Sequence, residues 1–152
     1  MQARDTWLAD NPKLTVIGAH LGSMAYDVAE VAQRLDRYPN FFVETAARFG
    51  DLAQQPRAAV RDFFIRYQDR LLYGTDLGTG SPAGEASEAD LQQERDRMDR
   101  RFSLHWHYLT RADTLRFEDY GLWFSATTQG LDLPAEVVEK FYYQNAARLL
   151  GL

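Results

Sequence analysis

The sequence contains no cysteine. Disulfide bonds, thiolate nucleophiles and cysteine-ligated zinc are therefore excluded. The lack of cysteine is compatible with a cytoplasmic protein, and cytoplasm is the location we expect.

Long apolar runs and an excess of basic residues are also missing. No stretch approaches the roughly 18 apolar residues of a membrane span, and the first residues do not form a signal peptide. The formal net charge is −5, which argues against a nucleic-acid surface. The remaining composition, 45% hydrophobic and 26% charged over 152 residues, is that of one globular domain, residues 1–152. We therefore expect no membrane and no nucleic-acid partner.

The first regular pattern is a strand followed by a helix. The apolar run Leu14–Gly18 predicts a strand that is buried on both faces, as in a parallel sheet. It ends at His20, and apolar residues at helical spacing then predict a helix over residues 24–38. Pro39 ends that helix.

The same cycle follows twice more. Phe41–Val43 predicts a second strand that ends at Glu44, and a helix is expected to begin at Pro56. Leu71–Gly74 predicts a third strand that ends at Asp76. The strand ends are spaced as in β-α-β crossovers, which need about 30 residues. The fold class is therefore α/β, with a parallel sheet and right-handed connections.

Residues 77–131 break this rhythm and predict a loop and a helical insertion. Residues 77–86 are rich in Gly, Ser and Pro and predict a loop over the strand ends. Ser87 and Asp90 predict a helix cap, and apolar spacing continues that helix to Leu109. Its charged middle is typical of a solvated helix.

The chain ends in a predicted closing helix. Residues 110–131 have no clear period, but Leu133-Pro134 is typical of a helix start and Gly151 of a helix cap.

Polar side chains at the strand ends are the candidate site. In parallel α/β folds these ends share one rim, which here carries His20, Glu44, Thr45, Asp76 and Arg48. His, Glu and Asp are ligands for zinc or manganese, and a metal would lower the pKa of a bound water. Asp76 would ligate the metal and accept a proton, while His20 would orient or protonate the substrate.

Each candidate also has a structural interpretation. His20 would then be a hydrogen-bonding residue behind a strand, and Asp76 would cap a turn. Glu44 would pair with Arg48.

His105-Trp106-His107 is a second candidate metal motif. On a strand both imidazoles would point the same way and chelate, but on a helix they lie about 200° apart. The surrounding pattern favours a helix, so we expect a packing or pocket role instead. The aromatic residues that would line such a pocket are also explained by ordinary core packing: Trp106, Tyr108, Trp123 and Phe124.

Four segments together resemble the amidohydrolase-related ("amidohydrolase 2") family, a branch that includes aromatic-acid decarboxylases. Val16–Gly22 resembles its sixth barrel strand, Asn40–Thr45 its seventh and Arg70–Asp76 its eighth. Residues 133–151 resemble the closing helix. The resemblance implies the C-terminal part of a (β/α)8 TIM barrel, with His20 and Asp76 as metal and catalytic residues. Glu44 and Arg48, from their place on the rim, are the residues we expect to bind the substrate.

The same resemblance implies an incomplete site. The family takes further ligands from a His-x-His on the first strand and a His on the fifth, whereas this chain begins at what resembles the fifth helix. Zinc takes three protein ligands, so the chain is a fragment or truncated reading frame, or another chain completes the site.

Two functional hypotheses follow. In the first, the chain is part of a metal-dependent hydrolase or decarboxylase for a small carboxylated or amide substrate and is inactive alone. Its cofactor would be a divalent metal, zinc before manganese, which this chain alone need not bind. In the second, it is a non-catalytic barrel remnant that serves as an assembly or binding module. The partners we expect are a small-molecule substrate and either a homo-oligomer or the complementing N-terminal portion of the barrel.

Overall fold

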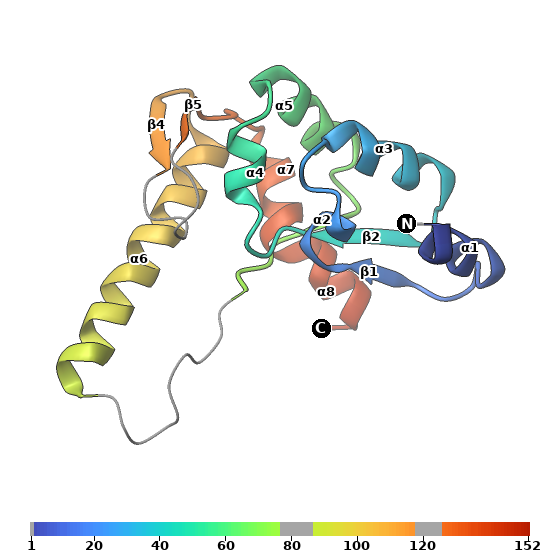
Figure 1. Ribbon diagram of the computed structural model, residues 1–152, viewed down its shortest axis with the longest axis horizontal. Coiled ribbons are helices and arrows are strands. Elements are labelled where there is room, and N and C mark those ends of the chain that lie inside the picture. The colour runs from blue at the N-terminus through green and yellow to red at the C-terminus, as the bar shows by residue number, and fades with distance from the viewer. Residues whose placement is uncertain (1, 77–86, 118–125) are drawn as a thin grey trace.

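The computed structural model describes residues 2–76, 87–117 and 126–152 (Figure 1). Its elements in chain order are α1 (Gln2–Asp10), β1 (Val16–Gly18), α2 (Ala19–Ser23), α3 (Val28–Arg37), β2 (Phe41–Glu44), α4 (Phe49–Ala53), α5 (Arg57–Arg66), β3 (Leu71–Leu72), α6 (Glu88–Thr110), β4 (Thr114–Phe117), β5 (Ala126–Gln129), α7 (Ala135–Glu139), η1 (Lys140–Gln144) and α8 (Asn145–Leu150). The mixed α/β class is confirmed. The numbering of the strands within a barrel stays a prediction.

The three predicted strands form one parallel sheet in the order β1-β2-β3. Gly18 pairs with Val43 and Val43 with Leu71, so the strands end near one another. The outer strands are shorter than the runs Leu14–Gly18 and Leu71–Gly74 predicted, because sheet pairing begins at Val16 and stops at Leu72.

The two faces of this sheet differ in burial. Phe41 and Val43 in the central strand are fully buried, whereas Phe42 between them is half-buried. Ile17 pairs with Phe42, so both lie on the same face, and Ile17 is 42% exposed. One face therefore carries the core, while the other is only partly covered.

Helix α3 begins later than predicted. Asp27 is its N-cap and accepts a hydrogen bond from the Ala29 amide at 2.9 Å. Met24, which was expected inside the helix, is buried in the turn before it. The predicted apolar stripe still packs inward through Val28, Val31 and Leu35.

The closing helical segment is anchored on β3. The side chain of Asn145, which is 1% exposed, donates to the carbonyls of Gln68 and Leu71 at 2.6 and 2.8 Å. The Tyr73 amide donates to the Phe141 carbonyl at 3.0 Å, just beyond the edge of the strand. Both predicted boundaries are confirmed, because Pro134 is the N-cap of α7 and Gly151 ends α8 in the left-handed region.

Helix α6 is the longest helix among the described residues, and its N-terminal half runs away from the rest of the molecule (Figure 1). The predicted cap is confirmed: Ser87 and Asp90 form a capping box. Its buried residues lie at the C-terminal end and are His105, Tyr108 and Leu109.

An antiparallel hairpin, β4 and β5, follows α6 where no regular pattern was predicted. Most side chains in β4 are exposed or half-buried and only Phe117 is buried, so the strand carries little hydrophobic alternation. The rest of the predicted insertion, residues 77–86 and 118–125, lies outside the described residues. None of the described helices is long and apolar enough to cross a membrane.

Candidate functional site

The backbone turns in an unusual way directly after β1. Four consecutive residues, His20 to Ser23, have positive φ angles of 55°, 55°, 63° and 59°. This region is costly for residues other than glycine, so surrounding contacts have to hold the turn in place. Leu21 contributes to this by full burial in the core.

Hydrogen bonds between His20, Glu44 and Ala46 join this turn to the end of β2. The His20 amide donates to Glu44 Oε1 at 2.5 Å, and the Ala46 amide donates to Glu44 Oε2 at 2.6 Å. The His20 ring closes the network, since Nδ1 lies 2.8 Å from the Ala46 carbonyl oxygen. The Glu44 carboxylate therefore links two strand ends through backbone amides.

This network fixes the tautomer of the His20 ring. A carbonyl oxygen can only accept a hydrogen bond, so Nδ1 carries the proton. In the neutral ring Nε2 is then the nitrogen with the free lone pair. A backbone carbonyl behind the other ring nitrogen is also the usual way in which proteins orient a histidine that binds a metal.

Gly74, which follows β3, has no side chain and so leaves room for the Glu44 carboxylate. A β-carbon built at Gly74 would overlap Glu44 Oε2 and lie 2.9 Å from the Ala46 amide nitrogen. The Gly74 amide lies 3.4 Å from the hydroxyl of the buried Thr45. Sequence reasoning had treated Gly74 as the last residue of a strand and missed this packing role.

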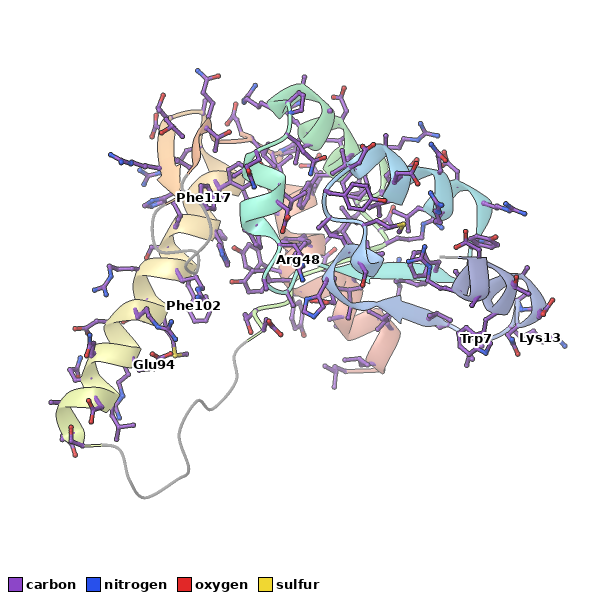
Figure 2. The ribbon with its side chains drawn as sticks, viewed as in Figure 1. Trp7, Lys13, Arg48, Glu94, Phe102 and Phe117 are labelled. Carbon is purple, nitrogen blue, oxygen red and sulfur yellow. The ribbon has the colours of Figure 1, made fainter. Side chains whose placement is uncertain are left out.

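Glu44 and Arg48 do not pair with each other as the structural alternative proposed. Arg48 Nη1 lies 3.5 Å from Asp51 Oδ2 instead, and Figure 2 shows Arg48 near the strand ends. The buried Nε of Arg48 makes no hydrogen bond with the described residues. Substrate binding by either residue stays a prediction, and Glu44 has both carboxylate oxygens occupied by amides.

Asp76 lies apart from the His20 network. It is exposed, has a φ of 57°, and shares no hydrogen bond with His20 or Glu44 within the described part of the chain. Strand β2 separates β1 from β3, and neighbouring strands lie about 4.8 Å apart. The two strand ends are thus separated by the width of one intervening strand, with the Glu44 network between them.

His105 belongs to the core beside this rim. Its ring stacks on Phe49 with centroids 3.8 Å apart, and its Nδ1 lies 2.9 Å from the Tyr73 hydroxyl. Burial, together with the charge of Arg101, lowers the pKa of His105 to about 3. Burial also raises the pKa of Tyr73 to about 12, so the pair is neutral at physiological pH.

The His105-x-His107 segment is helical, as predicted, so its rings do not face one another. His107 is half-buried on a different side of α6. Among the residues that the structure describes, no three His, Cys, Asp or Glu side chains lie close enough to hold a metal ion. The described residues therefore do not fit a complete metal site, and we derive no chemical step through a metal.

Two hollows lie where α6 meets the closing segment. The first has a volume of about 420 Å³ and is lined by Tyr73, Phe102, Ser103, Trp106, His107 and Tyr142. The second, of about 440 Å³, shares Trp106 and Tyr142. Trp106, for which we expect a pocket role, lines both hollows. Tyr108 instead is buried in the core. Trp123 and Phe124 lie outside the described residues.

In α/β proteins with parallel sheets, ligands bind at the carboxyl ends of the strands, where His20 and Glu44 lie here. The chain belongs to the amidohydrolase family, because the family model described as "Amidohydrolase" matches residues 2–152. No curated protein and no solved structure matches the chain. Membership supports a hydrolase-like parent family that is generally metal-dependent.

Proposed function

We propose that this chain contributes the strand-end residues His20 and Asp76 to a hydrolase-type active centre for a small carboxylated or amide substrate. The observation that carries the proposal is the orientation of His20 by Glu44 and Ala46. A histidine that only packed would not require two hydrogen bonds and a left-handed turn to fix its position.

Each residue has a role that follows from its surroundings. His20 presents Nε2, which can take or give a proton or bind a metal. Asp76 supplies an exposed carboxylate that can act as a base or ligand. Glu44 is a positioning residue, because its oxygens face backbone amides rather than open space.

Zinc, with manganese second, is the metal we propose for this centre. One imidazole and one carboxylate are fewer than the three protein ligands that zinc takes. The centre would therefore need donors that the described residues do not supply, and we expect the 152-residue chain alone to show little or no turnover. Decarboxylation is the alternative reaction, and the family resemblance supports it equally.

A non-catalytic assembly or binding module is the second candidate function. It is favoured by the lack of any group of three potential metal ligands among the described residues. The His20 network argues against it, because an assembly module has no need of an oriented imidazole at the strand ends.

Two measurements on the purified chain test the proposal. Long-range ¹H–¹⁵N correlation spectra should show His20 with its proton on Nδ1, and Glu44→Gln should disturb this signature more than Gln54→Glu does. Calorimetric zinc titration should show weak binding that His20→Ala and Asp76→Ala each reduce by about tenfold, with His107→Ala as the matched control.

Two outcomes would contradict it: a proton on Nε2 of His20, or zinc binding that neither substitution weakens. Robust metal-dependent turnover by the chain alone would instead contradict the expectation that further donors are needed.

A further inference from the structure

The N-terminal half of α6 has no covering partner within the described structure. Every residue from 88 to 104 is exposed or half-buried, and burial begins at His105. Figure 1 shows this half running beyond the body of the molecule. A helix that extends so far usually has a second surface to pack on, because isolated helices are marginally stable in water.

An apolar stripe continues along this projecting half. Leu91, Met98 and Phe102 are spaced by seven and four residues, so they lie on one helix face. Leu91 is 44% exposed, while Met98 and Phe102 are half-buried. The same face reaches the core at His105 and Leu109. The face that packs at one end of α6 is therefore offered to solvent at the other.

The charges of the whole projecting helix are divided along its length, and Glu94 and Arg95 are the two at its centre that flank the stripe. Residues 88–94 carry three acidic side chains and no Lys or Arg. Residues 95–101 carry four arginines against two aspartates. Figure 2 shows Glu94 on this projecting half and Phe102 nearer the body of the molecule. An element with one acidic and one basic section is complementary to a copy of itself that runs in the opposite direction.

We propose that α6 is a homodimerisation element, which packs antiparallel on the α6 of a second copy of this chain. A twofold axis that passes between Glu94 and Arg95 places Glu94 of each copy beside Arg95 of the other. The same axis sets Leu91 against Met98 of the second copy, and so covers the exposed part of the stripe. A parallel pair would place acidic beside acidic and basic beside basic sections.

The contact is short. Residues 88–102 span about 21 Å at 1.5 Å per residue, which limits the buried area. We therefore expect a dissociation constant on the order of micromolar, with weaker association at high salt because part of the attraction is between exposed charges. This inference does not depend on the proposed hydrolase function.

A charge-swap experiment on the full chain tests it, with molar mass measured by light scattering or sedimentation. In a dimer of Glu94→Arg chains, two arginines would meet on each side of the twofold axis. In a dimer of Arg95→Glu chains, two glutamates would meet there. Each variant alone should dimerise at least tenfold more weakly than the parent chain. A mixture of the two should recover dimers, as should E94R/R95E in one chain, because both restore opposite charges.

Arg100→Glu is the matched control. It makes the same charge change as Arg95→Glu on the opposite side of the helix, so dimerisation should be unchanged. Circular dichroism checks that every variant keeps its helix.

Spin labels at an engineered Ala89→Cys, which is exposed and points away from the stripe, give the orientation, since the chain has no other cysteine. The two positions should be offset by about 16 Å along the antiparallel pair, but lie level with each other in a parallel one. A parent chain that stays monomeric at all concentrations would overturn the proposal. So would single variants that dimerise like the parent, a mixture that stays monomeric, or labels that lie level with each other.

Discussion

At the scale of single residues, the rim of the sheet depends on a glycine as much as on its charged groups. Gly74 has no side chain where the Glu44 carboxylate lies, and that carboxylate holds both the His20 and Ala46 amides. The φ of Gly74 is one that other residues also adopt. Glycine is therefore needed at this position because a side chain would have no room.

We therefore predict that Gly74→Ala destabilises the fold by about 1–3 kcal/mol, through overpacking and displacement of the carboxylate. Urea unfolding measures this loss. The double variant Gly74→Ala/Glu44→Ala should lose less stability than the sum of the losses of the two single variants, since the new methyl group clashes with the Glu44 side chain. A Gly74→Ala protein with the stability of the parent would show that the site relaxes freely.

His105 provides a pH prediction. Burial and the charge of Arg101 lower its pKa from 6.5 to about 3. Between these values the unfolded chain binds a proton at this residue that the folded chain does not, so stability falls as pH falls from about 6.5 towards 3.

His105→Asn should remove up to about 1.4 kcal/mol per pH unit of that dependence. The measurement is the free energy of unfolding between pH 7 and 4 for the parent and the variant. His107→Asn is the control, because this histidine is only half-buried. Equal slopes in the parent and in His105→Asn would contradict the prediction.

At the scale of elements, one buried amide joins the closing helix to the sheet. Asn145 supplies both donors of its amide group to carbonyls beside β3. Asn145→Ala would leave these acceptors without a partner in a buried position, so we expect a loss of about 1–3 kcal/mol.

Thermal and urea unfolding measure this loss, and Gln144→Ala, at the exposed neighbouring position, should cost much less. Equal effects of the two substitutions would show that the Asn145 bonds add little to docking of the helix.

The elements also show which patterns the sequence could reveal. Strands β1 to β3 and helices α3, α5 and α6 were predictable, because apolar periodicity and caps such as Ser87 act within a few residues. Helix α4 and the hairpin β4–β5 were not predicted. Their sequences carry little periodicity, and contacts between segments far apart in the chain support them, since α4 packs against β5.

At the scale of the whole molecule, two surfaces are only partly covered by the residues that the structure describes. The sheet face that carries Ile17 and Phe42 is only partly covered, and the apolar stripe of α6 extends beyond the body. The proposed dimer covers the second surface alone. The first is the face that, in our proposal, a complementing part of a barrel would cover.

The sequence by itself determined the α/β class, the order of the three strands and the family, because these depend on local periodicity and on motifs that can be read in order. It also identified His20, Glu44 and Asp76 as strand-end residues. Only the tertiary structure decided which residues they contact there. It joined His20 to Glu44 and Ala46, left Asp76 apart from them, and placed His105 in the core rather than in a metal site. Hydrogen bonds and burial depend on which distant residues meet, and that is set by packing rather than by spacing along the chain.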